Sequence, residues 1–216
     1  MGYGFLDIAT TPSVRAAHAE NGSAAHWAGF RGERDFDRFT EAEAAFVAAR
    51  DGFYMATVSQ TGWPYVQYRG GPPGFLRVLD ERTLGFADFR GNRQYISLGN
   101  LRADDRVSLI LMDYLGRRRL KLFGHIEARD LADDPDLARC LATPGYRGLA
   151  DRALVIRLAH FDWNCPQHIV PRFTQAEIDA ALAPARDGLA ALEAENAELR
   201  AALAAVRSTP GLESRS

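Results

Sequence analysis

The spacing of hydrophobic positions changes at about residue 53. Before it, Thr11 and Pro12 predict one helix start, and Thr40 with Glu43 forms a capping box ahead of the apolar stretch AAFVAAR. After it, apolar and polar residues alternate in short runs bounded by turn residues, which is typical of strands. The pattern therefore predicts two N-terminal helices followed by a β-rich region.

Turn residues between alternating runs predict three hairpins. The paired runs are 53–59 with 64–70, 75–80 with 83–88, and 106–114 with 119–130. A short helix is expected at 95–100, and a helix at 134–146 is followed by a last strand at 153–163. Six or seven antiparallel strands with few helices predict a small closed barrel.

The C-terminal part predicts a long helix, which begins at a second capping box of Thr174 and Glu177. Its seam alternates steps of four and three: Ile178, Leu182, Ala185, Leu189, Leu192, Asn196, Leu199, Leu203 and Val206. An asparagine in such a seam favours one register and a parallel dimer. Pro184 and Gly188 interrupt the early part, so two interpretations stay open. The helix pairs as a dimeric coiled coil, or it packs on its own barrel.

Composition limits the classes of function. The predicted parts are 1–50, an N-terminal helical segment, 51–172, the barrel, 173–206, the C-terminal helix, and 207–216, a disordered tail. A formal net charge of -2 gives no overall basic field, so nucleic acid is not an expected partner. No apolar run of about 18 residues is present, so no membrane partner is expected either. We expect a cytoplasmic protein.

Cysteines and lysines narrow the chemistry further. Cys140 and Cys165 are far apart and predict no metal site, and the adjacency of Cys165 and His168 does not supply the facing geometry of a catalytic pair. Catalytic residues stay unknown at this point. Lys121 is the single lysine, which excludes a Walker-type phosphate loop. If phosphate is bound, we expect arginine to bind it.

Three clusters of polar and basic residues lie in the β-rich region. One is the face of Tyr65, Gln67 and Arg69, the second is the segment 88–94, and the third is the face of Arg119, Lys121, Phe123 and His125. Each cluster alone is typical of a solvated sheet face. Together in one small β domain they favour an anionic ligand, because guanidinium groups and unpaired backbone N–H groups bind phosphate.

The order of these features resembles a known family. The segments are TVSQTGWPYVQYRGG, GFADFRGNRQYIS, RVSLILMD and RRLKLFGHIEA. They resemble the FMN-binding split barrel of the pyridoxamine 5'-phosphate oxidase-like family, in particular its branch of predicted flavin-nucleotide-binding proteins. The resemblance covers about residues 40–172 and is most specific at GFxxVLDxxTLGFADFRGNRQY. It implies a six- to seven-stranded antiparallel split barrel, with the N-terminal helices and long C-terminal helix added, and a homodimer with two FMN molecules at its interface.

The resemblance also implies cofactor-binding residues. They are Gln67, Tyr68 and Arg69 on a phosphate-binding strand, Asp88, Phe89, Asn92, Arg93 and Gln94 in a strand-to-helix turn, and Arg119 and Lys121 on a later strand that reaches the flavin, across the dimer in one arrangement. We single out Arg93 because we expect it just inside the start of the short helix. Backbone N–H groups and the helix dipole favour an anion there.

The sequence departs from the oxidase itself at two places. Arg69 and Gln94 stand where the oxidase uses lysines around the phosphate, and the C-terminal elements that grip the vitamin phosphate are not recognisable. The segment FDWNCPQHIVPR at 161–172 stands there instead. Its residues Trp163, Gln167, His168 and Arg172 are interpreted either as the edge of the flavin pocket or as a plain connector.

The resemblance predicts an FMN-dependent oxidoreductase that acts on a small molecule and is not a true pyridoxamine phosphate oxidase. NAD(P)H or another donor supplies electrons in this interpretation. The alternative is a non-enzymatic flavin or haem carrier or sensor, with His125 or His168 as the haem ligand. A deazaflavin in place of FMN is a further alternative, and the sequence does not identify the substrate.

Overall fold

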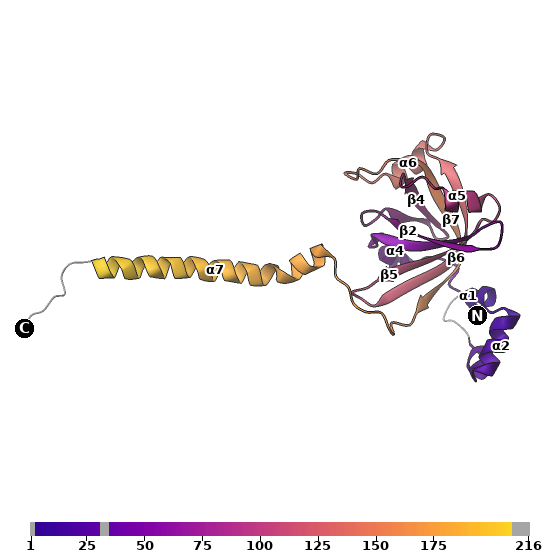
Figure 1. Ribbon diagram of the computed structural model, residues 1–216, viewed down its shortest axis with the longest axis horizontal. Coiled ribbons are helices and arrows are strands. Elements are labelled where there is room, and N and C mark those ends of the chain that lie inside the picture. Colours follow the sequence, from indigo (N-terminus) through magenta and orange to yellow (C-terminus); the bar gives the residue numbers. More distant parts are fainter. Residues whose placement is uncertain (1–2, 31–34, 209–216) are drawn as a thin grey trace, which may run out of the picture. The chain divides into compact units, whose positions relative to one another are not determined.

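A computed structural model describes residues 3–30 and 35–208 of the chain (Figure 1). Before the first strand this part contains four helices: α1 (Gly4–Ala9), α2 (Pro12–Glu20), α3 (Ala24–Ala28) and α4 (Glu41–Ala48). The two helices expected from the sequence are α2, where Thr11 accepts from the Val14 N–H, and α4, which has the Thr40–Glu43 capping box. The sequence did not predict α1 and α3, which have only six and five residues.

The described residues form one seven-stranded antiparallel sheet. Its strands are β1 (Gly52–Val58), β2 (Pro64–Gly70), β3 (Leu76–Asp80), β4 (Thr83–Phe89), β5 (Arg106–Asp113), β6 (Arg118–Asp130) and β7 (Ala150–Asn164). Their order in the sheet is β2-β1-β5-β6-β7-β4-β3. The three predicted hairpins are confirmed as β1–β2, β3–β4 and β5–β6.

The sheet closes on itself because its two ends interact. After β2 the chain turns directly toward β3, and Phe75 in this connection packs against Phe53 of β1 and Phe86 of β4. Arg69 at the end of β2 forms an ion pair with Asp88 at the end of β4, at 2.7 Å. The main hydrophobic core fills the inside of this split barrel, as alternate positions of the strands predict.

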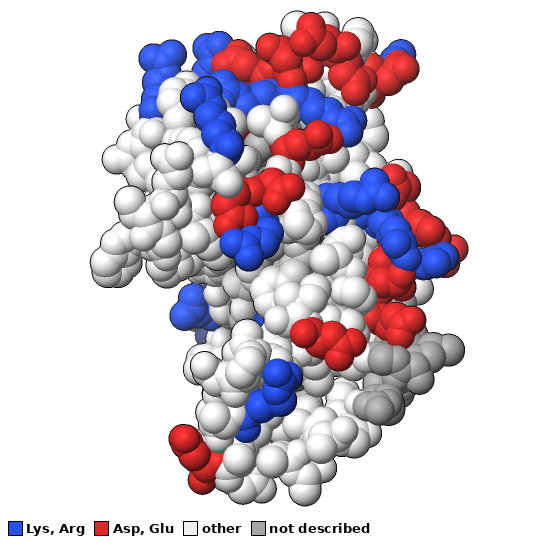
Figure 2. Space-filling view, turned by 90° about the vertical axis from the view of Figure 1, so that its right-hand side faces the viewer, with Lys and Arg blue, Asp and Glu red and all other residues white. Residues whose placement is uncertain are grey.

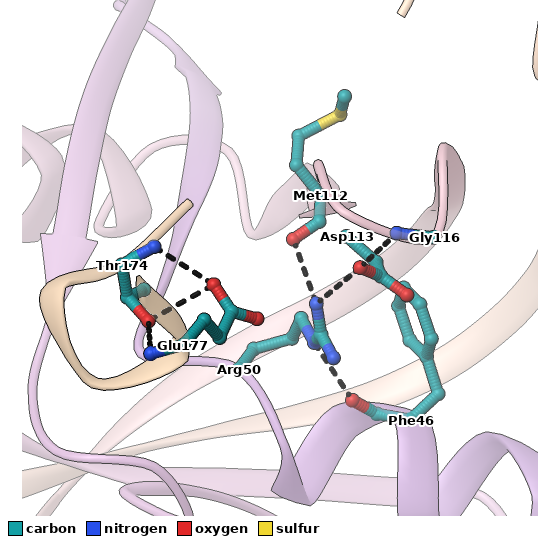
Figure 3. A network of polar contacts seen from close by, with 7 residues as sticks. All are labelled: Phe46, Arg50, Met112, Asp113, Gly116, Thr174 and Glu177. Atoms are coloured by element: carbon teal, nitrogen blue, oxygen red, sulfur yellow. Dashed lines mark hydrogen bonds and ion pairs between the residues drawn. The ribbon is translucent and has the colours of Figure 1, made fainter. Parts of the chain in front are cut away.

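Helix α4 closes one side of the barrel core. Its Phe46 and Val47 are buried in the core. Just after the helix, Arg50 donates to the carbonyls of Phe46 and Met112, both at 3.2 Å, and its Nη1 lies 3.5 Å from the Asp113 carboxylate (Figure 3). These contacts attach the helix end to the end of β5. Helix α4 is therefore held to the barrel by apolar packing and by polar contacts.

Helix α6 (Pro135–Leu141) lies between β6 and β7 in the chain and is confirmed inside the predicted range 134–146. Asp134 caps it by accepting a hydrogen bond from the Leu137 N–H at 2.9 Å. Leu137 and Leu141 pack in a second, smaller apolar cluster with Ala87, Ala153 and Val155 of β4 and β7. This cluster supports the pair β4–β7, which carries part of the site described below.

The chain divides into two compact units, Met1–Val170 and Pro171–Ser216. In the second unit, α7 (Gln175–Ser208) begins at the predicted capping box, where Glu177 accepts from the Thr174 N–H and hydroxyl at 2.7 and 2.9 Å (Figure 3). The helix runs two residues past the predicted end at 206, and positions 209–216 of the predicted tail lie outside the described residues. No helix in the described part of the chain combines the length and the apolar character needed to cross a membrane.

Candidate functional site

A pocket of about 180 Å³ lies between the ends of β2 and β4, the start of β7 and the helix α5 (Ile96–Leu101). Six of the ten predicted cofactor residues line it: Gln67, Arg69, Asp88, Phe89, Asn92 and Arg93. A second hollow of about 240 Å³ shares several of these walls and adds Tyr68. The fold therefore brings together the first two clusters that the sequence pattern singled out.

Helix α5 holds one wall of the pocket in place through two polar contacts. The Ser97 hydroxyl donates to Oε1 of Gln67 at 3.1 Å, and the Asn100 amide donates to the Thr57 hydroxyl at 3.0 Å. Ser97 and Asn100 are both buried. Because buried polar groups are held by their hydrogen bonds, these contacts fix α5 and Gln67 relative to β1 and β2.

The turn from β4 to α5 differs from the expected geometry. We expected Arg93 just inside the helix start, and this is wrong, because α5 begins at Ile96. Arg93 and Tyr95 both have left-handed backbone conformations, with φ of 61° and 53°. The backbone N–H of Gln94 donates to the side chain of Asn92 at 3.1 Å, which stabilises the turn. Arg93 therefore reaches the pocket from a turn and not from a helix end.

Two ion pairs form part of the pocket wall. Arg69 and Asp88 are 2.7 Å apart, and their side chains are only 16% and 11% exposed. Arg90 binds the Asp151 carboxylate through two nitrogens at 2.9 and 2.5 Å, and both side chains are nearly half exposed. The hydrogen bond from Arg90 holds the pKa of Asp151 below its usual value. Asp151 therefore carries negative charge at neutral pH.

Positive charge remains after these pairs are counted. Arg93 has no hydrogen bond or ion pair to any other described residue, and Arg152 lies over the Tyr95 ring at 5.3 Å. The four arginines that line the pocket face two aspartates. The excess is two positive charges on a small concave surface, which suits an anion.

Unpaired donors point to the same conclusion. In the described part of the chain, the buried side-chain nitrogens and oxygens without a hydrogen-bond partner are Nε of Arg69, Nε of Arg119 and Nδ1 of His160. A buried donor without a partner costs about 1–3 kcal/mol. Two of these three atoms belong to predicted cofactor residues. Arg69 lines the pocket, and its Nε is buried in the pocket wall.

Tyr68 and Gln94 lie away from the first pocket. Tyr68 points to the outer face of the sheet, where its ring meets that of Tyr54 edge to face at 5.4 Å. Burial, followed by the nearby charge of Asp51, raises the pKa of Tyr68. Gln94 is exposed and accepts a hydrogen bond from the Asn92 amide at 3.2 Å. Neither residue lines the first pocket, and Tyr68 lines only the second hollow.

Arg119 and Lys121 lie on the outer face of the sheet. In the strand register, Lys121 pairs with Ile110, Ile110 with Tyr54 and Tyr54 with Tyr68, so these side chains share one face of the sheet. Gln67 and Arg69 point to the other face. Neither residue lines the two hollows described above. Within a single chain, the third predicted cluster is therefore not joined to the other two.

The N-terminal segment covers this outer face. Phe5 of α1 stacks on Phe123 with ring centroids 4.6 Å apart, and the Lys121 ammonium lies 4.9 Å from the Phe5 ring centre. The ammonium also binds the Asp162 carboxylate at 2.9 Å, and the Tyr3 hydroxyl donates to the same carboxylate. Burial and this carboxylate raise the pKa of Tyr3 well above its usual range. The Lys121 ammonium is therefore already bound by residues of its own chain.

Charges elsewhere on the surface are mixed. Figure 2 shows acidic and basic side chains interspersed on the face that it presents, without a broad field of one sign. Among the described residues, no group of three or more His, Cys, Asp or Glu side chains could hold a metal ion. The pocket at β2, β4 and α5 is thus a local concentration of arginine on a molecule of mixed charge.

Comparison with known proteins agrees with this arrangement. A family model described as "Pyridoxamine 5'-phosphate oxidase" matches residues 39–157, which is more than half of the chain. The chain belongs to the pyridoxamine 5'-phosphate oxidase family. The matched range contains every predicted cofactor-binding residue, and the split barrel expected from the sequence is confirmed.

Several solved structures are similar to the chain at low identity. HupZ of Group A Streptococcus is 14% identical, with 62% of this chain and 99% of that chain covered and a TM-score of 0.46. A putative pyridoxamine 5'-phosphate oxidase from Lactobacillus delbrueckii is 18% identical, with coverages of 58% and 94% and a TM-score of 0.45. An FMN-binding protein from Syntrophomonas wolfei is 14% identical, with coverages of 71% and 95% and a TM-score of 0.43. No curated protein matches the sequence.

The tentative substrate residues lie beyond the range matched by the oxidase family model. Trp163 donates from Nε1 to Glu43 at 2.9 Å and packs against Phe46. Gln167 and His168 are exposed in the segment after β7, and neither they nor Trp163 line the two hollows. Arg172 belongs to the second compact unit. The side chain of Trp163 is thus part of the packing between α4 and the barrel.

Sequence reasoning missed several residues that line the pocket. They are Arg90, Gly91, Tyr95, Leu98, Asp151 and Arg152. Arg90 and Tyr95 belong to the same turn as Arg93, and the arginine-rich turn was the available signal for them. Asp151 and Arg152 arrive through the pairing of β4 with β7, in which Phe89 lies opposite Ala150. No local pattern in the sequence indicates that register.

Proposed function

We propose that this protein is an FMN-dependent oxidoreductase acting on a small molecule, and that residues 51–172 bind the flavin. The phosphate of FMN occupies the pocket between β2, β4 and α5 in this proposal. Family membership supports a flavin, and the arginine-lined pocket supports its phosphate. The observation that carries the proposal is an unpaired Arg93 in a pocket that four arginines and only two aspartates line.

The size of the hollows limits how much of the cofactor they hold. Pockets for drug-sized ligands have volumes of about 300–1,000 Å³. The hollows here measure about 180 and 240 Å³, so either one suits the phosphate end of FMN and not the whole molecule. The flavin ring then needs a further surface. We propose that a second copy of the chain supplies it in a homodimer, with Arg119 on the outer face as the candidate for this contact, since Lys121 is held by Asp162 of its own chain.

Each pocket residue has a separate role in this proposal. Arg93 binds phosphate oxygens with its planar fork, and the Arg69 guanidinium adds positive charge in the pocket wall. Asp88 holds the Arg69 guanidinium in position through their ion pair. Gln67 is held by Ser97 and lines the same wall. Bound FMN supplies the redox chemistry, with NAD(P)H or another small molecule as electron donor, and the chain supplies position and charge.

The cellular setting is also part of the proposal. Cys140 and Cys165 are both exposed and free in this structure. Exposed free thiols suit a reducing compartment, which supports a cytoplasmic protein.

We propose that pyridoxamine phosphate is not the substrate. The elements that grip the vitamin phosphate are not recognisable in the sequence, and Trp163 in the corresponding segment is engaged by Glu43. We expect no meaningful oxidation of pyridoxamine or pyridoxine phosphate by the flavin-loaded protein, measured as pyridoxal phosphate formed. Turnover of about 1 per second or faster, an ordinary enzymatic rate, would contradict this.

A pair of matched variants tests the phosphate site. Arg93 and Arg117 are both exposed turn arginines with positive φ, 61° and 50°, so an alanine meets a similar backbone cost at each. A charge-assisted hydrogen bond contributes roughly 1.5–3 kcal/mol, so Arg93→Ala should weaken FMN about tenfold to a few hundredfold. Binding of riboflavin, which lacks the phosphate, should change much less. Arg117→Ala should change neither affinity.

Fluorescence titration of FMN and riboflavin into both variants measures these effects. If Arg93→Ala binds FMN as tightly as the unmodified protein, or loses FMN and riboflavin equally, the phosphate is not bound here. A second experiment separates an enzyme from a carrier. NAD(P)H should bleach the bound yellow chromophore without oxygen, and air should restore it. A chromophore that no reductant of this kind bleaches supports a carrier or sensor.

A further inference from the structure

One side of α7 carries a continuous stripe of exposed apolar side chains. Its large members are Ile178, Leu182, Leu189, Leu192, Leu199, Leu203 and Val206, which are 39–73% exposed. Together with Ala185 and Asn196 they recur in alternating steps of four and three along a 34-residue helix. A helix in water gains most of its stability from packing of its apolar face, and a long exposed stripe marks an interaction surface.

Asn196 restricts which partner this stripe accepts. In the heptad numbering that the stripe defines, Leu182, Leu189, Asn196 and Leu203 occupy a positions, and Ala185, Leu192, Leu199 and Val206 occupy d positions. In a parallel, in-register pair, a positions face each other, so two Asn196 side chains can share hydrogen bonds. In an antiparallel pair, Asn196 would face an apolar d residue and lose them. The asparagine thus favours a second α7 in parallel.

The charges beside the stripe favour the same partner. Glu195 occupies a g position and Arg200 the following e position. In a parallel coiled coil these positions face each other across the two chains, so Glu195 of one copy meets Arg200 of the other, and this happens twice. Neither residue forms an ion pair with another described residue of its own chain. The remaining g positions, Ala181, Gly188 and Ala202, are uncharged and create no repulsion.

We propose that α7 pairs with α7 of a second copy as a parallel, in-register, two-stranded coiled coil over 189–206. The pairing begins after Pro184 and Gly188, which weaken the first turns of the helix. This surface is separate from the flavin pocket, and the proposal does not depend on the identity of the cofactor. It gives the chain an interface in addition to any contact between barrels.

Disulfide trapping in the full-length protein tests the pairing directly. Cys140 and Cys165, both exposed, are first replaced by serine. Val206→Cys then places a thiol in the stripe, and Ala204→Cys places one on the outward side two residues away. A disulfide needs Cα atoms within about 7 Å. Under mild oxidation, Val206→Cys should give covalent dimers at least about tenfold faster than Ala204→Cys, because local concentration sets the rate.

The position near the helix end makes this test sensitive to orientation. In an antiparallel pair over the same stripe, the two copies of residue 206 lie at opposite ends, roughly 25–30 Å apart by the helix rise. Packing of α7 on its own barrel also keeps them apart. Slow cross-linking of Val206→Cys, or equal rates for the two cysteine variants, therefore overturns the proposal.

Charge reversal tests the register. On the Val206→Cys background, Glu195→Arg places like charges opposite each other and should slow cross-linking several-fold. Adding Arg200→Glu restores opposite charges in the parallel register and should recover the rate. Glu198→Arg makes the same change of charge at an outward position and should have little effect. If the double reversal is as slow as the single one, the proposed register is wrong.

Discussion

Two regions of this molecule contain clusters of basic residues, and they differ in the partners that their own chain gives these residues. In the pocket at β2, β4 and α5, four arginines face two aspartates, and Arg93 has no partner among the described residues. On the outer face of β6, Lys121 is paired with Asp162 and covered by Phe5. A basic residue is therefore available to an anionic ligand only where the fold brings in fewer acidic partners than basic groups.

Within the pocket, the two ion pairs differ in how far they are exposed. The pair Arg69–Asp88 is mostly buried, whereas Arg90–Asp151 in the same pocket is about half exposed. Charges that have lost most of their water depend strongly on each other, while exposed pairs are screened. The stability of the pocket should therefore depend on the first pair, and its net charge can be changed at the second.

The largest expected effect comes from breaking the buried pair. Asp88→Ala leaves the Arg69 guanidinium without its partner, and we expect the free energy of unfolding to fall by about 3 kcal/mol. Urea unfolding followed by tryptophan fluorescence measures it. The double variant Arg69→Met with Asp88→Leu removes both charges and should recover most of the loss. If the double variant is as unstable as the single one, the loss reflects packing and not an uncompensated charge.

A smaller effect is expected at the covered face of β6. Phe5 is buried against Phe123, and Phe5→Ala removes this contact. We expect the free energy of unfolding to fall by about 2 kcal/mol. This is less than is usual for Phe→Ala, because a short helix at a chain end can detach by itself. Trypsin should then cleave after Arg15 faster than in the unmodified protein. Trp27→Ala, at a partly exposed residue, serves as the control, and equal cleavage in both variants would count against a role for Phe5 in attaching α1.

The smallest effect is expected at the exposed pair of the pocket. Because the pKa of Asp151 is lowered by Arg90, this carboxylate stabilises the folded state above its ordinary pKa, and the contribution disappears as pH falls through the lowered value. Asp151→Asn should therefore melt slightly earlier than the unmodified protein at pH 7 and at the same temperature in acid below the lowered pKa. Thermal unfolding at both pH values measures the difference. A gap that persists in acid would show that the charge of Asp151 is not the cause.

The strands could be predicted from the sequence because their signals are local. The run 64–70 alternates in polarity, is bounded by turn residues and is found as β2 with the same limits. The helices α1 and α3 were missed because elements of six and five residues are too short to show a helical period. The helix predicted at 95–100 is found within one residue as α5, but Arg93 lies before its start, because Arg93 and Tyr95 adopt left-handed conformations, which sequence rarely indicates.

The pocket was predictable only in part for a different reason. Six lining residues were predicted because they belong to two segments whose order resembles a known family: Gln67, Arg69, Asp88, Phe89, Asn92 and Arg93. Asp151 and Arg152 enter through strand pairing between segments some sixty residues apart, and the covering of Lys121 by Phe5 joins segments more than a hundred residues apart. Contacts of this kind depend on the closed fold, which a pattern of single residues does not specify.

The position of Lys121 makes this residue a chemical probe for movement of the N-terminal segment. Since the sequence contains one lysine, an acylating reagent finds a single ε-amino group in the chain. That amine is paired with Asp162 and contacts the Phe5 ring, so it should react faster when α1 is away from β6. A rise in the rate at which this one side chain is acylated thus reports that the N-terminal segment has moved away.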